Sequence, residues 1–385
     1  MSPAAHLFLA DLGDALGIDV EAVRFTGAGV LGAPFAMTDL GAACLAGAGA
    51  AIAGLVSDAG PLATGDRRVT VDRPLATGLF HRASRPLRAT TRSPFHPMSR
   101  DFPTADGRWV RFQANYPRLR AAALAVLGAG EDAGEIAAAV AGAKADEVEA
   151  AVVAGGGAAA ASRTVGQWAV HPQGAAVAAE PLVAVTPAGR WDGDLRPVPD
   201  RPLAGIRVLD LTRVLAGPMA TRLLAGFGAQ VLRLDPPGYD EPGGIGSGDL
   251  TLGKRCAELN LKTAAGKERF ADLLARADLL VHGLRPGALD ALGLDAGTRQ
   301  AISPGLSEVT LNAYGWTGPW RDRRGFDTLV QNSTGMALAG GTWAGTGAPY
   351  RWPLSIIDHS AGYLMAAAAV AALTRRARTG PMGLS

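Results

Sequence analysis

The sequence predicts an α/β protein in which a Rossmann-like parallel-sheet domain is joined to a smaller α+β domain. The main observation is that apolar runs rich in β-branched residues alternate with helical patterns in the second half of the 385 residues. The alternation begins with a strand over Ile206–Thr212, a helix over Met219–Gln230 and a strand over Val231–Asp235, which together make a β-α-β unit. A hairpin pattern in the first half indicates a domain of different architecture.

Further elements of the same kind complete the second half. They are expected in the order strand, helix, strand, helix, strand over Ala257–Leu261, Ala264–Ala275, Asp278–Leu284, Ala288–Leu294 and Leu306–Gly315. Additional helices then run to Arg376. Strands that alternate with helices in this way are typical of a parallel sheet covered by helices.

The first half is organised differently. An Ala- and Gly-rich helix is expected over Asp39–Val56, and a turn at Ala105–Gly107 joins two alternating runs into a hairpin. Helices follow over Tyr116–Val153 and near 163–174, and the Pro-rich segment Pro187–Pro202 reads as a linker. We therefore expect a helical segment at 1–60, a small α+β domain with later helices at 61–190, a linker at 191–202 and the Rossmann-like domain at 203–385.

Composition and charge exclude several classes of partner. Lys and Arg total 37 and Asp and Glu total 35, so the net charge of +2 gives no field for holding nucleic acid or an anionic membrane. Cys44 and Cys256 are too few for a disulfide framework, and no Cys/His cluster has zinc spacing, which favours a cytoplasmic protein without a metal. The N-terminus lacks the basic segment of a signal peptide, and the run Leu40–Val56 is too short and too poor in large apolar residues for a bilayer span.

One stretch of the sequence occurs twice. Residues 34–54 align without a gap with residues 353–373, and the alignment sets Asp39 opposite Asp358. Ala-rich helices match easily through composition alone, but the coincident Pro and Asp positions favour a true repeat.

Asp358 is the first candidate for chemistry, because it stands between an apolar run and a long helical pattern. One interpretation is an N-cap, in which the carboxylate accepts hydrogen bonds from backbone N–H groups of the helix. The other is a nucleophile toward an acyl carbonyl, with backbone amides at the helix start or near Gly340 stabilising the charge that develops.

Basic residues near strand ends form candidate anion sites. Arg213 with Gly217 and Pro218 follows the first strand of the β-α-β unit, where a helix N-terminus faces the carboxyl edge of the sheet. A wider basic set consists of Lys254, Arg255, Arg285 and Arg233, whose alternative role is a solvated or salt-bridged face. No G-x-G-x-x-G fingerprint follows the first strand, and the Gly-rich run 335–347 lacks the lysine of a P-loop, so that run is a loop or a lid.

Several motifs occur in one order that resembles the class III CoA-transferase (CaiB/BaiF) family. They are RPLAGIRVLDLTRVLAGPMATRLLAGFGAQVLRLDPP, LTLGKRCAELNLKTAAGKERFADLL, ADLLVHGLRPGALDALGL, LSEVTLNAYGWTGPWRDRRGFDTLVQNSTGMA and PLSIIDHSAGYLMAAAAVAAL, spread over 201–380. The run FPTADGRWVRFQA and the helices after it resemble the family's small domain, which here precedes the large domain instead of following it. The resemblance therefore describes a rearranged or partly duplicated family member.

The resemblance implies the function, the ligand and the site residues. It implies a CoA-binding Rossmann-like domain in a CoA transferase that moves CoA from an acyl-CoA thioester to a carboxylic acid, with Asp358 as the nucleophile that becomes an aspartyl-CoA thioester. The residues matching the family's CoA-contacting region are Arg213, Leu215, Ala216, Lys254, Arg255 and Arg285. By analogy with the family we expect a homodimer, with Asp39 as a vestigial copy or a cap.

The sequence departs from the family at two positions, which leaves two alternatives open. Where racemase members carry a histidine, this chain reads Gly325-Phe326-Asp327, which disfavours an acyl-CoA racemase or isomerase unless His359 substitutes. Many members read NRGKR where this chain has TLGKR. This change, together with the placement of the small domain before the large domain, leaves a catalytically silent CoA-binding subunit as an alternative.

Overall fold

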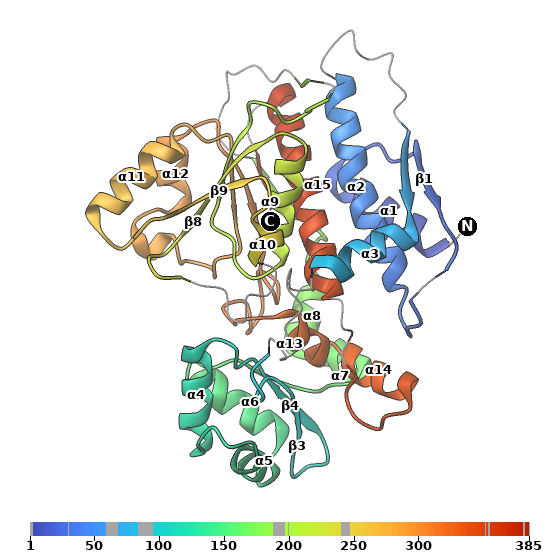
Figure 1. Ribbon diagram of the computed structural model, residues 1–385, viewed down its shortest axis with the longest axis vertical. Coiled ribbons are helices and arrows are strands. Elements are labelled where there is room, and N and C mark those ends of the chain that lie inside the picture. Colours follow the sequence, from blue (N-terminus) through green and yellow to red (C-terminus); the bar gives the residue numbers. More distant parts are fainter. Residues whose placement is uncertain are drawn as a thin grey trace.

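The largest unit of the protein is a seven-stranded sheet, seen edge-on at the centre of Figure 1. The computed structural model describes residues 3–29, 31–58, 68–83, 95–187, 197–198, 200–239, 247–350, 352, 355–379 and 382–384. The sheet has the strand order β6-β12-β11-β10-β7-β8-β9. Its strands are β6 (Val185–Pro187), β7 (Arg207–Asp210), β8 (Gln230–Asp235), β9 (Lys254–Glu258), β10 (Leu279–His282), β11 (Ser307–Thr310) and β12 (Met382–Leu384).

Six of these strands are parallel, and only β6 runs antiparallel to its neighbour β12. The chain places β7, β8 and β9 outward in one direction, then returns to add β10, β11 and β12 on the other side of β7. This is the doubly wound order 3-2-1-4-5-6 counted from β7, and its switch point lies between β7 and β10. The predicted parallel α/β domain is confirmed.

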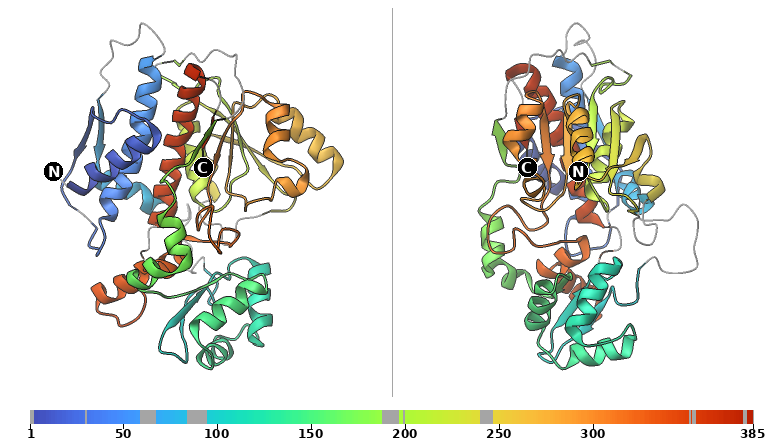
Figure 2. Two further views of the ribbon diagram at one scale, coloured as in Figure 1. Left: turned by 180° about the vertical axis from the view of Figure 1, so that it is seen from behind. Right: turned by 90° about the vertical axis from the view of Figure 1, so that its left-hand side faces the viewer.

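Helices cover both faces of the sheet (Figures 1 and 2). On one face α9 (Ala216–Gly226) and α15 (Ile356–Thr379) pack together, because their small and aliphatic side chains form a continuous core with the sheet. On the other face Phe270 and Leu274 of α11 (Ala264–Leu274) pack against Leu209 and Leu280, and α12 (Ala296–Ile302) lies beside them. Three further helices of the large domain are α10 (Ser247–Leu250), α13 (Asp327–Ser333) and α14 (Met336–Ala344).

Two predicted elements of this domain were placed wrongly. The strand expected at Ala257–Leu261 is β9, which starts at Lys254 because its backbone pairs with β8 from Val231 onward. The helix expected over Ala288–Leu294 is only a 3₁₀ turn at Asp290–Leu292. Gly293 ends it with a left-handed backbone, φ 76°, so the turn does not extend into a helix.

The smaller domain is built on a three-stranded antiparallel sheet of β3 (Asp101–Pro103), β4 (Trp109–Phe112) and β5 (Ala159–Ala161). The predicted hairpin is β3–β4. Its helices are α4 (Pro117–Leu127), α5 (Ala133–Ala141) and α6 (Ala145–Ala154), followed by α7 (Val165–Val170) and α8 (Pro172–Ala178). Gln173 and Glu180 tie the α8 region to the large domain, because they bond to the backbone of residues 314–320.

The N-terminal segment contains a two-stranded parallel sheet and three helices. It contains α1 (Pro3–Leu16), β1 (Val23–Thr26), α2 (Met37–Asp58), β2 (Val69–Asp72) and α3 (Arg73–Ala83). The parallel strands β1 and β2 are joined through α2, and the connection between the parallel strands β11 and β12 contains α13, α14 and α15. The helices α2 and α15 lie side by side (Figures 1 and 2). Both are long and apolar enough to span a membrane, but each buries most of its surface inside this protein, as core helices do.

The expected domain boundaries need two corrections. The segment 69–83 packs with α2 and β1, so it belongs to the N-terminal unit and not to the small domain. The strand β6, assigned to the small domain from sequence, pairs with β12 as the outer strand of the large sheet. Most of the expected linker, residues 191–196 and 199, lies outside the described residues.

Candidate active site

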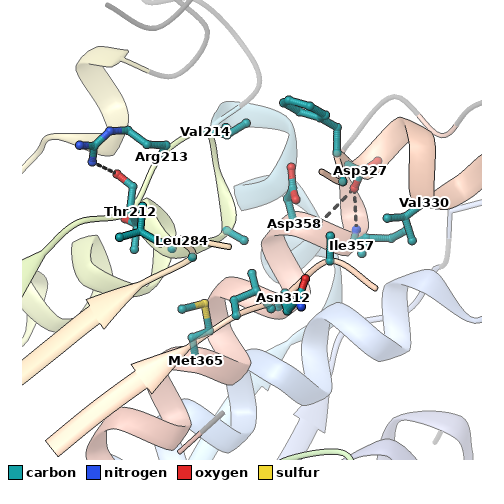
Figure 3. A pocket seen from close by; sticks show the side chains of 18 of the residues that line it. Thr212, Arg213, Val214, Leu284, Asn312, Asp327, Val330, Ile357, Asp358 and Met365 are labelled. Atoms are coloured by element: carbon teal, nitrogen blue, oxygen red, sulfur yellow. Dashed lines mark hydrogen bonds between the residues drawn. The ribbon is translucent and has the colours of Figure 1, made fainter. Parts of the chain in front are cut away.

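A cavity of about 250 Å³ opens at the switch point of the sheet (Figure 3). It is lined by the segments that follow β7, β10 and β11, by the start of α13 and by the first turns of α15. Ligands of doubly wound proteins bind in this crevice, because loops leave neighbouring strands in opposite directions there. The cavity lining includes Arg213, Val214, Ala216, Phe326, Asp327, Val330, Asp358 and Met365.

Asp358 faces this cavity and does not cap its own helix. The backbone N–H groups of Ile357 and Asp358 donate to Oδ2 of Asp327, at 3.0 and 3.2 Å (Figure 3). Gln331 Nε2 donates to the other oxygen of Asp327 at 2.5 Å. Asp327 therefore holds the start of α15, and the interpretation of Asp358 as an N-cap was wrong. The half-buried Asp358 carboxyl makes no hydrogen bond or ion pair with any described residue.

Burial raises the pKa of both carboxyl groups. For Asp358 the pKa lies well above the ordinary carboxyl value, first because of burial and then because of the Asp327 charge. The pKa of Asp327 is also raised by burial, but the N–H donors of Asp358, Gln331 and Ile357 oppose that rise. Asp327 accepts these hydrogen bonds, so it accommodates a negative charge better than Asp358 does.

The backbone is strained on both sides of the cavity. Among the described residues only Val214, at φ 70°, and Ser355, at φ 45°, have a left-handed backbone without being glycine. Val214 lines the cavity, and Ser355 immediately precedes α15. A β-branched residue in this region is an outlier that costs on the order of 1–3 kcal/mol, and such strain gathers at functional sites.

Lys254 does not reach the cavity, contrary to the sequence prediction. Its Nζ atom is fully buried and donates to Asp210 Oδ2 at 2.9 Å, Thr221 Oγ1 at 2.6 Å and Pro218 O at 2.9 Å. Burial lowers the pKa of Lys254, and the Asp210 carboxylate opposes that effect. Asp210 also accepts from Thr212 N at 2.9 Å, so this buried cluster holds the turn between β7 and α9. Lys254 supports the cavity wall from behind.

The other predicted CoA-binding residues separate into three groups. Ala216 lines the cavity, whereas the Leu215 side chain is buried in the hydrophobic core. Arg213 lies on the rim with its guanidinium turned away from Asp358 (Figure 3), donating to Leu234 O at 2.8 Å and contacting Asp235 at 3.1 Å. Arg255 is not at this site, because it lines a different cavity.

Arg285 belongs to a basic cluster that the sequence only partly revealed. The pKa of Arg324 is lowered by burial and then by the positive charges of Arg285 and Arg118. Arg285 follows the cavity-lining Leu284, Arg324 precedes the cavity-lining Gly325, and Arg118 comes from α4 of the small domain. Sequence reasoning missed Arg118 and Arg324, because nothing in the local pattern relates a small-domain helix to the RPG turn.

His359 and the Gly-rich segment have structural roles. His359 is buried with its Nδ1 2.9 Å from Ser355 O, and it does not line the cavity. The expected lid at 335–347 is largely the helix α14, and Gly340 packs against the carbonyl of Tyr350. The helix-start amides expected to hold an oxyanion are already bonded to Asp327.

Asp39, the residue that aligns with Asp358, is in a different environment. It is buried, and Arg73 contacts it through Nε at 2.8 Å and Nη2 at 2.5 Å. An ion pair of this kind satisfies the carboxylate, so Asp39 is a structural residue.

Residues 203–383 match the sequence profile of CoA-transferase family III. The succinyl-CoA--D-citramalate CoA-transferase of Chloroflexus aurantiacus is 36% identical over 197 residues, which cover 47% of this chain and 48% of the relative. The formyl-CoA:oxalate CoA-transferase of Escherichia coli is 33% identical over 190 residues, covering 46% and 45%. A CaiB/BaiF family protein of Brucella suis has a crystal structure with 29% identity and a TM-score of 0.41, covering 48% of this chain and 52% of that one. The chain therefore spans about half the length of the relatives it matches.

Proposed function

We propose that the protein transfers CoA from an acyl-CoA thioester to a carboxylic acid, with Asp358 as the nucleophile. The observation that carries this proposal is that the Asp358 carboxyl is freed from helix capping by Asp327 and faces a cavity at the switch point of the sheet. A carboxylate with few hydrogen bonds and little solvent is a stronger nucleophile than a hydrated one. The family assignment of residues 203–383 supports the same chemistry.

The transfer proceeds in two balanced halves. A carboxylate oxygen of Asp358 attacks the thioester carbonyl carbon, and the C–S bond breaks. CoA leaves as the thiolate, and the acyl group stays on Asp358 as a mixed anhydride. The thiolate then attacks the Asp358 carbonyl carbon, releasing the acyl group as its carboxylate and leaving an aspartyl-CoA thioester. An acceptor carboxylate repeats the two steps in reverse, so that acceptor-CoA departs and the Asp358 carboxylate is restored.

The basic cluster of Arg118, Arg285 and Arg324 is proposed to hold the phosphates of CoA. Arg285 and Arg324 flank residues that line the cavity, and the positive charges of Arg285 and Arg118 add to burial in lowering the pKa of Arg324. Guanidinium groups match phosphate geometry with paired hydrogen bonds, and a bound phosphate relieves that repulsion. Because Arg118 belongs to the small domain, CoA bound here contacts both domains.

The acyl group is proposed to be uncharged. Apolar side chains such as Phe326, Val330 and Met365 line the cavity, and it already contains the carboxyl groups of Asp327 and Asp358. Among the described lining residues the one cation is Arg213, which is directed to Leu234 O and Asp235. If the acyl group carried a free carboxylate, as a succinyl group does, that carboxylate would lose its water in this cavity without gaining a cationic partner. Its desolvation would weaken binding of the acyl-CoA.

Covalent trapping tests the proposal. After incubation with butyryl-CoA, mass spectrometry of the wild-type protein should find an adduct that hydroxylamine converts to a hydroxamate at Asp358. Asp358→Asn should abolish both the adduct and CoA transfer. Asp39→Asn, assayed at a temperature where circular dichroism shows it folded, is the matched control, because it changes the residue that aligns with Asp358 and should leave the adduct in place. If Asp358→Asn transfers CoA at the wild-type rate, the proposal fails; if the wild type binds CoA by calorimetry without forming an adduct, the chain is a silent CoA-binding subunit.

We further propose that the protein acts as a homodimer in the cytoplasm. The free thiols of Cys44 and Cys256 support a reducing compartment. Light scattering after size-exclusion chromatography tests the dimer, which a mass equal to one 39.3 kDa chain would contradict.

A further inference from the structure

A second cavity, of about 510 Å³, opens at the amino edge of the large sheet. It lies beside the first residues of β7, β8 and β9, whereas the Asp358 cavity lies at the opposite, carboxyl edge. Four exposed arginines line this second cavity, and no acidic side chain is among its described lining residues. The arginines are Arg201, Arg207, Arg255 and Arg276.

The fold brings these four side chains together from separate segments. Leu209 on β7 pairs with Leu232 on β8, which pairs with Arg255 on β9, so the three residues share one face of the sheet. Arg207 lies two residues before Leu209 and projects from the same face. Arg276 follows the end of α11, which covers this face, and Arg201 precedes β7.

The cluster lacks the acidic partners that usually accompany arginines. None of the four guanidinium groups forms an ion pair with a described residue, and that of Arg207 bonds only to Arg276 O, at 3.3 Å. Asp278, next to this region in the sequence, is bonded to Arg376 at 2.9 Å and accepts from the backbone of Arg207. Four like charges around one cavity repel each other, and a multivalent anion relieves that repulsion.

We propose that this cavity binds an oligophosphate, separately from the CoA site. Guanidinium groups form paired hydrogen bonds with phosphate oxygens, and a chain of linked phosphates presents several such sites at once. The oligophosphate is either inorganic or the phosphate tail of a nucleotide. The aliphatic side chains of Leu209, Leu232 and Leu273 line the same cavity and provide a surface for a nucleotide base. This assignment stands independently of the proposed CoA transfer.

Calorimetric titration with inorganic tripolyphosphate tests the site, with ATP and AMP as parallel ligands. Arg207→Gln/Arg255→Gln should weaken tripolyphosphate binding at least about tenfold, because two charge-assisted contacts are lost. The control is Arg269→Gln/Arg321→Gln, which removes two charges from exposed side chains elsewhere, 64% and 57% accessible. Tighter binding of ATP than of tripolyphosphate identifies a nucleotide site, and equal binding identifies a site for the phosphates alone.

Three outcomes overturn the proposal. The first is wild-type protein that does not bind tripolyphosphate, and the second is equal weakening in the control variant. The third concerns an alternative role of the arginines. The helices α9 and α11 end near this cavity, and arginines can stabilise a helix by interacting with its C-terminal carbonyl groups. If that is their only role, Arg207→Gln/Arg255→Gln lowers the melting temperature while tripolyphosphate stabilises neither protein.

Discussion

Replacing Lys254 with methionine separates two roles for this residue, support of the cavity wall and binding of CoA. The Nζ atom and the Asp210 carboxylate are both fully buried, 2.9 Å apart, and Nζ makes two further hydrogen bonds. Lys254→Met leaves Asp210 as a buried charge without its cation. Removing one partner of a buried ion pair destabilises a protein by about 3–5 kcal/mol. We therefore expect a fall of that size in the free energy of unfolding.

Urea unfolding followed by circular dichroism measures this loss. Lys254→Met/Asp210→Asn should recover about half of it, because the uncompensated charge is removed with its partner. At temperatures where the variant remains folded, its affinity for CoA should keep the salt dependence of the wild type. The reasoning is refuted if Lys254→Met unfolds like the wild type and instead loses CoA affinity most strongly at low salt, as the loss of an exposed phosphate contact would cause.

The remaining predictions concern pH and substrate choice. The pKa of Asp358 is raised in the folded protein, so its contribution to stability is present at low pH and is lost as the pH rises through the folded pKa. Melting temperatures should therefore show that Asp358→Asn stabilises the protein more at about pH 8 than at about pH 5, and equal effects would contradict the raised pKa. Burial lowers the pKa of His282 to about 4, so stability should fall by up to about 3 kcal/mol as the pH drops below about 6.5, and His282→Leu should flatten this decline. The kcat/KM for butyryl-CoA should exceed that for succinyl-CoA by at least about tenfold. Val330→Arg should reduce this ratio, because it adds a cation to the cavity, whereas Val330→Leu should leave the ratio unchanged. A wild-type preference for succinyl-CoA would refute the proposal of an uncharged acyl group.

The order of the elements in the large domain is readable from the sequence. The β7–α9–β8 unit, α11, β10 and β11 all occur where apolar runs and helical patterns alternate, because a strand buried on both faces has to be continuously apolar. Asp358 was also found from the sequence, since an acidic residue between an apolar run and a helix has a restricted set of roles. The repeat of residues 34–54 in 353–373 corresponds to α2 and α15.

Which side chains meet was decided by the tertiary structure. The cap of α15 comes from Asp327, which lies 31 positions before Asp358 in the chain. The motif that contains Lys254 and Arg255 sends one side chain into the core and the next to another cavity, because successive strand residues point to opposite faces of the sheet.

The sequence by itself thus determined the architecture and the candidate nucleophile, because periodicity and helix boundaries depend on neighbouring residues. Only the folded chain decided that Asp358 is freed from capping, that Lys254 is buried, and that the charges of Arg118 and Arg285 both act on Arg324. These depend on strand order and on the docking of the small domain, which set the distances between segments far apart in the chain. Hydrogen bonds and charges act over a few ångströms, so residues that carry the same local signal acquire different roles once the sheet is assembled.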